Sequence, residues 1–268
     1  MAFDRQKFLA QLHKLSPEGQ KYEIPLHNFA KVSSTNQTLW QLLETGATTP
    51  RIVIAEQQTA GKGQWGRSWV SEVGGLYLSL ALSPNIPATN SAHLTIFSAW
   101  GVANSLRNYN IPVLIKWSND LILAGRKLGG ILTETRVQQG NINRAVIGVG
   151  INWENLVPDT GISLQSFREN RETILLDSLE DLAAIIVTGI LAAFRDYASL
   201  GIEKILANYR ELLINLGRKV VIDGSPGIIV GVTPKGELRI RLSSQGASTE
   251  VAIPPGTIQL GYDFSGNW

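Results

Sequence analysis

The sequence predicts an α+β protein in which a larger domain with a mixed sheet, residues 1–216, precedes a small β domain, residues 217–268. Two observations support this fold class. In the first part, strand and helix patterns follow one another without the strict alternation of a doubly wound sheet. In the second part, about fifty residues consist of short strand candidates with regular turn signals, as in a small barrel or sandwich.

The composition is that of a folded protein and excludes several classes of function. The 268 residues are 44% hydrophobic and 17% charged, and the formal net charge of +2 predicts no broad attraction to DNA or RNA. The absence of cysteine excludes disulfides, thiol nucleophiles and cysteine-bound zinc. Residues 1–20 lack an apolar signal segment, and the longest apolar run, 182–194, is too short for a membrane span. We therefore expect a cytoplasmic protein that binds neither DNA nor membranes.

Hydrophobic periodicity predicts the elements of the larger domain. One helix is expected between Thr35, as its N-cap, and Gly46, as its C′ residue. The other predicted helices cover residues 3–15, 91–106, 178–200 and 202–216. Runs of apolar and β-branched residues predict strands at residues 26–32, 51–56, 76–82, 113–117, 127–137 and 145–151. The last of these is apolar on both faces, so we expect it at the centre of the sheet.

The small domain has the texture of a β structure. Its strand candidates cover residues 219–222, 227–232, 238–242 and 249–253. Glycine, proline and serine residues lie between these segments and predict tight turns.

A glycine-rich polar loop, residues 57–69, is the first candidate for chemistry. Three glycines within six residues allow backbone N–H groups to approach an anion, and Lys62 and Arg67 add positive charge. The spacing is neither a Walker A loop nor a dinucleotide-binding fingerprint. The alternative is a flexible surface loop anchored in the core by Trp65 and Trp69.

Three further segments carry weaker signals. In residues 116–131, Asn119 and Asp120 can be turn formers, and Lys127 can be a solvated charge on an edge strand. The glycines of residues 148–152 indicate either a nearby ligand or close packing within a strand. Residues 33–36 form a good helix N-cap, which needs no functional explanation.

In order along the chain, these segments resemble the motifs of biotin protein ligases, also called biotin–acetyl-CoA-carboxylase ligases. Residues 34–36 are similar to the family's Ser-Thr-Asn, and residues 61–67 to its Gly-Arg-Gly-Arg-x-Gly-Arg loop. Residues 116–121 resemble Lys-Trp-Pro-Asn-Asp-Leu, residues 127–132 resemble Lys-Leu-x-Gly-Ile-Leu, and residues 148–152 resemble Gly-x-Gly-Ile-Asn. Each motif is weak alone, but five in order are specific.

The resemblance implies a catalytic domain of the biotin/lipoate ligase type followed by a small SH3-like domain. It also implies that biotin and ATP react to give biotinyl-5′-AMP, with Mg²⁺ assisting. Biotin then passes to a lysine of the biotin carboxyl carrier protein of acetyl-CoA carboxylase. The resemblance allows a homodimer, and the sequence identifies no ligands for Mg²⁺.

The same resemblance assigns roles to individual residues. Lys127, with Arg67, is expected to neutralise charge on the reacting phosphate, and Ser34, Thr35 and Gln58 are expected to bind the ureido ring of biotin. The remaining expected substrate-binding residues are Asn36, Gly61, Lys62, Gly63, Gln64, Trp69, Tyr77, Asn119, Asp120, Gly130, Gly148 and Asn152.

Two positions depart from the family motifs. Gln64 stands where the family has the second arginine of its loop, and Ser118 stands where it has proline. Serine can also occupy a turn. The loss of the arginine removes a permanent charge and a fork of donors, which predicts weaker retention of the adenylate.

Three alternatives remain open at this point. A lipoate or octanoate ligase shares the catalytic fold, although the loop and the 116–121 stretch favour biotin. A biotin-responsive DNA-binding repressor is disfavoured, since the ligase pattern begins near residue 27. A nucleic-acid-binding module at the end of the chain is also disfavoured, because five basic and four acidic residues follow Leu216.

Overall fold

The structure is a computed structural model that describes residues 3–17, 22–169, 174–244 and 247–262. Its helices are α1 (Arg5–Leu15), α2 (Thr35–Glu44), α3 (Ser91–Arg107), α4 (Leu164–Arg168) and α5 (Leu179–Glu211), with short 3₁₀ turns at Gln64–Gly66 and Ala88–Asn90. Its strands are β1 (Leu26–Val32), β2 (Arg51–Gln58), β3 (Gly75–Leu82), β4 (Ile86–Pro87), β5 (Leu114–Lys116), β6 (Asp120–Leu123), β7 (Arg126–Gln138), β8 (Asn141–Asn152), β9 (Lys219–Ile222), β10 (Ser225–Val232), β11 (Leu238–Ser244) and β12 (Ala247–Ile253).

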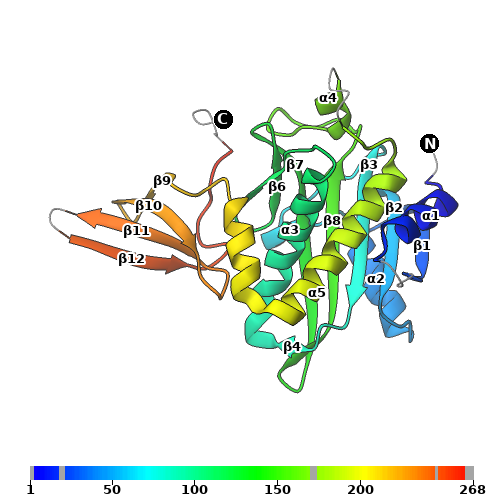
Figure 1. The fold of residues 1–268 in the computed structure, drawn as a ribbon, viewed down its shortest axis with the longest axis horizontal. Helices are drawn as coiled ribbons and strands as arrows, with labels where there is room; N and C mark the ends of the chain where they lie inside the picture. The colour runs from blue at the N-terminus through cyan, green and yellow to red at the C-terminus, as the bar shows by residue number, and fades with distance from the viewer. Residues whose placement is uncertain (1–2, 18–21, 170–173, 245–246, 263–268) are drawn as a thin grey trace.

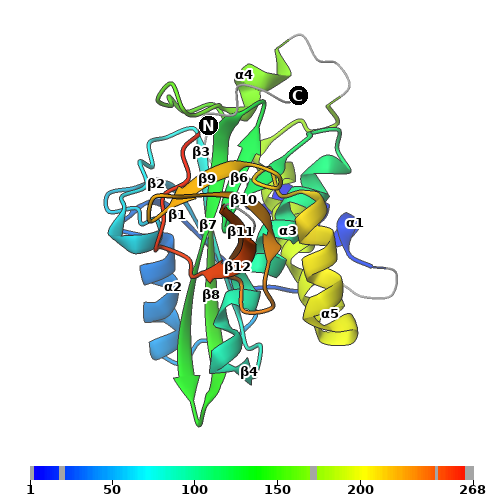
Figure 2. The same cartoon turned by 90° about the vertical axis from the view of Figure 1, so that its left-hand side faces the viewer.

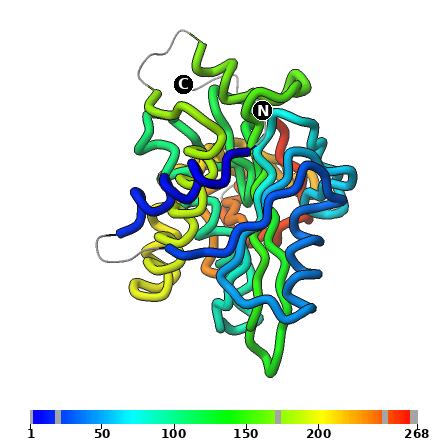
Figure 3. The backbone as a smooth tube through the Cα atoms, turned by 90° about the vertical axis from the view of Figure 1, so that its right-hand side faces the viewer, coloured from blue at the N-terminus to red at the C-terminus, as the bar shows by residue number. Residues whose placement is uncertain are grey.

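A mixed sheet forms the larger part of the molecule (Figure 1). Its strands follow the order β1-β2-β3-β8-β7-β6-β5, with β4 paired to β8. The β1–β2 pair is parallel and the other neighbours are antiparallel, as the predicted α+β class requires. Helix α2 covers one face, while α1, α3 and α5 cover the other (Figures 2 and 3).

The longest hairpin of the sheet joins β7 to β8. Gln139 and Gly140 connect the two strands, both with positive φ, 52° and 80°, as two-residue hairpin turns require. Strand β8 lies between β3 and β7, which confirms the central position expected for residues 145–151. The hairpin matters for the site, because β7 carries Lys127 and β8 carries the glycines of residues 148–150.

The predicted β domain is confirmed as a four-stranded antiparallel sheet, in the order β12-β11-β10-β9. It extends from the end of the molecule nearest to β5 and β6 (Figure 1). Ile229, Val232, Leu238 and Ile240 of this sheet are buried in the same hydrophobic cluster as α3 and α5. The boundary at residues 216 and 217 remains a prediction.

Helix α5 differs from the expectation of two helices at residues 178–200 and 202–216. It runs through Gly201, whose φ of 77° marks a kink, and it ends at Glu211. The apolar residues that follow add to the sheet edge, because Ile115 exchanges backbone hydrogen bonds with Leu212 and Ile214 at 2.8 and 2.9 Å. Helix α5 is long and apolar enough to cross a membrane, and its buried residues belong to the same hydrophobic cluster as those of α3 and the sheet.

Smaller differences concern local signals. Ser34, not Thr35, is the N-cap of α2, and the Thr35 hydroxyl bonds to another side chain. The short elements α4 and β4 were not predicted, since five and two residues carry no readable periodicity.

Candidate active site

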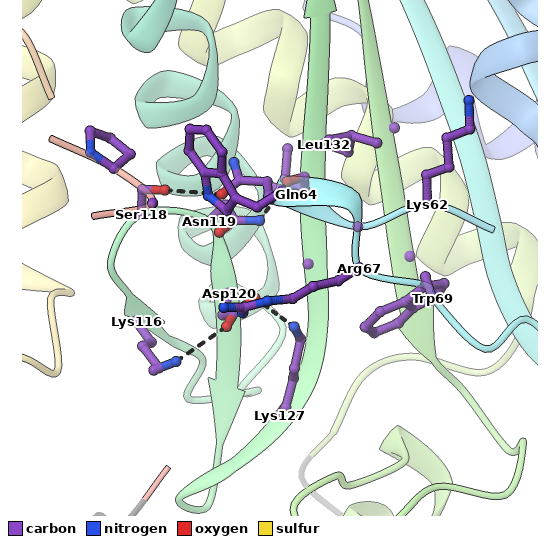
Figure 4. Close-up of a pocket in the computed structure, with 18 of the residues that line it drawn as sticks. Lys62, Gln64, Arg67, Trp69, Lys116, Ser118, Asn119, Asp120, Lys127 and Leu132 are labelled. Atoms are coloured by element: carbon purple, nitrogen blue, oxygen red, sulfur yellow. Dashed lines mark hydrogen bonds and ion pairs between the residues drawn. The ribbon is translucent and has the colours of Figure 1, made fainter. Parts of the chain in front are cut away.

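A cavity of about 470 Å³ lies between the glycine-rich loop, the β5–β8 part of the sheet and residues 255–262 (Figure 4). Most of the residues expected to form the site line it together, although they come from distant parts of the chain. They are Ser34, Thr35, Asn36, Gln58, Lys62, Gly63, Gln64, Arg67, Trp69, Asn119, Asp120, Lys127, Gly130 and Gly148.

Uncharged hydrogen-bonding side chains at and near the start of α2 line one end of the cavity, and the Asn36 amide is held from behind by the Glu134 carboxylate at 2.8 Å. The backbone N–H and hydroxyl of Thr35 donate to Gln58 Oε1 at 2.8 and 3.1 Å. The buried Ser79 hydroxyl lies 2.8 Å from Thr35 Oγ1 and 2.6 Å from Asn36 Oδ1. A Cβ atom at Gly148 would stand only 2.4 Å from Asn36 Oδ1, so any other residue there would displace the Asn36 amide. These groups are fixed in position and can recognise a polar, uncharged ligand group.

The opposite end is a cluster of charges around one carboxylate. Asp120 lies at the start of β6, where its Oδ1 is 2.6 Å from Lys127 Nζ and its Oδ2 is 3.5 Å from Lys116 Nζ. Figure 4 shows Arg67 extending from the loop toward the same carboxylate, while Lys62 points away from it. Four basic side chains and one acidic side chain therefore line the described part of the cavity, an arrangement that attracts anions.

Burial acts on Lys116 more strongly than on its neighbour. Desolvation lowers the pKa of Lys116, the Asp120 carboxylate partly restores it, and Lys127 and Arg67 lower it again by repulsion. The Lys116 side chain is 7% exposed, whereas the Lys127 side chain is 26% exposed. Lys127 is thus the better placed of the two to meet a ligand in the cavity. The alternative of a solvated edge-strand charge is wrong, since β7 is internal and Lys127 is ion-paired.

The glycine-rich loop folds back on itself as a narrow hairpin. Gly63 N–H donates to Arg67 C=O at 2.7 Å, and Trp69 N–H donates to Gly61 C=O at 2.9 Å. Trp65, at the tip, has a φ of 59° and is 63% exposed, so it is not the core anchor that the surface-loop alternative required.

Trp69 lies deeper and presents a polar atom without a partner. Its indole Nε1 is buried and has no hydrogen-bond acceptor among the described residues. A Cβ atom at residue 150 would come within 2.6 Å of this nitrogen, so Gly150 admits the ring. Because an unpaired buried donor is costly, a ligand oxygen is its natural partner.

Three of the expected site residues do not line the cavity. Tyr77 is buried and donates its hydroxyl to Glu72 C=O, and Gly61 packs directly against Trp69 C=O. Asn152 donates to Lys127 C=O at 3.3 Å and so supports the strand that carries this lysine. Their expected binding roles remain predictions, but their contacts are with neighbouring protein groups.

Several lining residues were missed from the sequence. Lys116 and Trp117 belong to a recognised motif but were not expected to form the site, and Ser118 was noted only as a departure from that motif. Their position beside Asn119 and Asp120 was a usable signal. Residues 255–262, with Tyr262 bonded to Asp120, gave only a turn signal at Pro255 and Gly256 and no signal for a site. Asn119 does form a turn, but it also donates to Ile131 C=O at 2.7 Å and so joins β7 to the motif.

Comparison with known proteins agrees with this geometry. The family described as "Biotin/lipoate A/B protein ligase family" matches residues 29–152. A biotin protein ligase from Aquifex aeolicus, solved with biotin and ATP, has the same fold: the TM-score is 0.65 at 24% identity, over 85% of this chain and 95% of that one. The bifunctional ligase/repressor BirA of Salmonella typhimurium is 30% identical over 85% of this chain and 71% of its own length.

The chain belongs to the biotin/lipoate protein ligase family. The resemblance to biotin protein ligases and the predicted fold class are both confirmed. The bifunctional ligase/repressor BirA of Bacillus spizizenii is 30% identical over 69% of this chain. The matched region spans 58% of the length of that relative. The family match ends at Asn152, so it includes the loop, Asp120 and Lys127 but not residues 255–262.

Proposed function

We propose that the protein activates biotin with ATP and transfers it to a lysine of a carrier protein. The observation that carries this proposal is a single cavity with a neutral hydrogen-bonding end and a cationic end. Biotin has a polar ureido ring at one end and a carboxylate at the other, and the nucleotide adds phosphates beside the carboxylate. The two ends of the cavity match these groups in order.

The neutral end would hold the ureido ring. An unmatched polar group costs about 1–3 kcal/mol on burial, so a ureido ring needs donors and acceptors in fixed positions. Ser34, Thr35 and Gln58 line this end, and the Thr35–Gln58 hydrogen bonds hold both side chains in place. A lipoyl or octanoyl chain has no group that would use this network, which favours biotin over the other acids.

The cationic end would serve the reaction. In the first step, a carboxylate oxygen of biotin bonds to the α-phosphorus of ATP and pyrophosphate leaves. In the second step, the carrier amine bonds to the biotinyl carbonyl carbon, AMP leaves and the amine loses a proton. Lys127 and Arg67, which line the cavity, would stabilise the negative charge that develops on the phosphate oxygens in the first step.

Magnesium enters the proposal only as a companion of ATP. Asp120 is the one carboxylate among the described lining residues, and two lysines already contact it. The described residues therefore do not form a Mg²⁺ site by themselves, and no step is assigned to the ion. Phosphate oxygens bind Mg²⁺ in many nucleotide sites with few protein ligands.

The partner and the location follow from the same proposal. The motif resemblance points to the biotin carboxyl carrier protein of acetyl-CoA carboxylase as the acceptor, and to the cytoplasm as the compartment. No DNA-binding role is proposed, because the basic side chains of the site line a cavity of small-molecule size.

The test is transfer of radiolabelled biotin to a purified carrier domain in the presence of ATP and Mg²⁺. ATP–pyrophosphate exchange with biotin, lipoate and octanoate should show exchange with biotin alone. Exchange with lipoate or octanoate but not biotin would assign the protein to the other branch of its family. Exchange with none of the acids would refute an adenylating function.

A further inference from the structure

The last described segment of the chain returns from the small sheet to the cavity. After β12, residues from the segment 255–262 line the cavity and contact the tip of the glycine-rich loop. Gly256 packs under the Trp65 indole, so closely that a Cβ atom would come within 2.6 Å of the ring. The described part of the segment includes Tyr262, whose hydroxyl donates to Asp120 Oδ2.

The Tyr262 ring covers Lys116. The ammonium nitrogen of Lys116 lies 3.8 Å from the centre of this ring, which is direct contact between the cation and the aromatic face. Asp120 Oδ2 occupies another side of the same nitrogen, at 3.5 Å. The ring and the carboxylate together explain why the Lys116 side chain is 7% exposed.

Lys127 is not covered in this way. Its ammonium nitrogen is 5.9 Å from the Tyr262 ring and 5.2 Å from the Trp69 ring, and more of its side chain is exposed. An anion must bring an oxygen to within about 2.7–2.9 Å of an ammonium nitrogen to form a charge-assisted hydrogen bond. The cavity permits that approach at Lys127, whereas the aromatic ring obstructs it at Lys116.

We propose that Tyr262 is a removable cover over a second anion-binding lysine, Lys116, in the same cavity. With the cover in place, a polyphosphate meets Lys127 and Arg67. With the cover displaced, it also meets Lys116, and Asp120 Oδ2 is released from the phenol. The small sheet thus controls, through its C-terminal segment, how many cations act on the ligand. The identity of the anion as a nucleotide polyphosphate rests on the proposed function, but the covering of Lys116 does not.

Lysine reactivity tests the cover directly. Native protein, Tyr262→Phe and Tyr262→Ala are reductively methylated at one pH, and the rate at Lys116 is compared with that at exposed Lys7 by mass spectrometry. Phenylalanine keeps the ring and removes the hydroxyl, so Lys116 should react slowly there, as in the native protein. In Tyr262→Ala it should react roughly tenfold faster, the equivalent of about 1.4 kcal/mol of lost contact.

Equal rates at Lys116 in Tyr262→Ala and in native protein would overturn the proposal, as would equally fast reaction in Tyr262→Phe. Far-ultraviolet circular dichroism and thermal melting confirm that each variant is folded. If the alanine variant is not folded, Tyr262→Ser provides a second variant without the ring.

Binding of inorganic pyrophosphate tests the anion site. Calorimetry should give about three- to tenfold tighter binding for Tyr262→Ala than for native protein, because one cation is added to the site. Replacing the lysine as well, in Tyr262→Ala with Lys116→Gln, should remove the gain. Unchanged or weaker binding in the single variant would refute the second anion site. Neither measurement uses biotin, so a failure of the biotin assays leaves both results interpretable.

Discussion

Replacing Asp120 by asparagine tests whether one carboxylate organises the cationic end of the cavity. Asparagine has nearly the same shape and still offers an oxygen to the Tyr262 hydroxyl, but it carries no charge. Lys116 and Lys127 would lose their counterion at 3.5 and 2.6 Å while remaining close to each other and to Arg67. The change therefore removes the attraction and leaves the repulsion.

The size of the effect follows from burial. Removing one partner of a fully buried ion pair costs about 3–5 kcal/mol. Lys127 is about one quarter exposed, so water can partly replace the carboxylate at that lysine, whereas Lys116 has little access to water. We therefore expect the free energy of unfolding to fall by about 2–3 kcal/mol at neutral pH, which moves the urea midpoint by about 1 M.

The pH dependence gives a sharper test. Burial already holds the pKa of Lys116 below its ordinary value, and loss of Asp120 would lower it further. A lysine whose pKa is lower in the folded than in the unfolded state destabilises the fold at pH values where it is protonated. This destabilisation disappears as the pH rises from the folded-state pKa to the unfolded-state pKa. The deficit of Asp120→Asn should therefore shrink as the pH rises toward the ordinary lysine pKa of about 10.4.

Urea unfolding at several pH values measures both effects, with Asp223→Asn as the matched control. Asp223 is an exposed turn residue with a φ of 48°, a conformation that asparagine tolerates. A deficit of less than about 0.5 kcal/mol, the usual range of a surface substitution, would refute the assignment of Asp120 as the organising charge. If the deficit stays constant with pH, the loss of the Asp120 charge does not change the pKa of Lys116.

Three further predictions concern the proposed reaction. Lys127→Ala should lower the adenylation rate by about two orders of magnitude and change biotin affinity little, because the lysine charge acts mainly in the transition state. Equal losses in rate and in binding would make Lys127 a simple binding residue. Residues 57–69 should gain hydrogen-exchange protection when biotin and ATP are added, and unchanged protection would count against closure of the loop. Gln64→Arg should slow dissociation of biotinyl-AMP roughly tenfold, because it adds one charge-assisted hydrogen bond. A dissociation rate equal to or faster than that of the native protein would show that neighbouring residues already hold the intermediate.

The parts of the fold that were predictable are those that local pattern determines. The strand at residues 26–32 was predicted with its observed limits, and the four strands of the small sheet were located to within two residues at each end. The end of α5 was not predictable. Residues 212–216 continue an apolar helical pattern, but their backbone groups pair with Ile115, a partner about a hundred residues earlier in the chain.

The same distinction holds for the site. Lys127, Asp120 and the glycine-rich loop lie in motifs whose residues are adjacent in sequence. Tyr262 lies 142 residues from Asp120, within a segment that has no motif, and only the course of the chain after β12 brings them together. The two departures from the family motifs also meet, because Ser118 Oγ lies 3.5 Å from Gln64 Oε1. Sequence reasoning treated them separately, since nothing in the residues indicates that they are neighbours.

The small sheet supports the cationic end of the cavity at a second point. Trp117 donates its indole N–H to Gly236 C=O, in the turn between β10 and β11, and its backbone N–H to Asn215 Oδ1. Asp120 follows Trp117 by three residues and lies between Lys116 and Lys127. A shift of this turn would therefore move the carboxylate that both ammonium groups share. Because charge stabilisation in a transition state depends on groups already in position, the sheet would contribute to the proposed reaction without touching the reacting atoms.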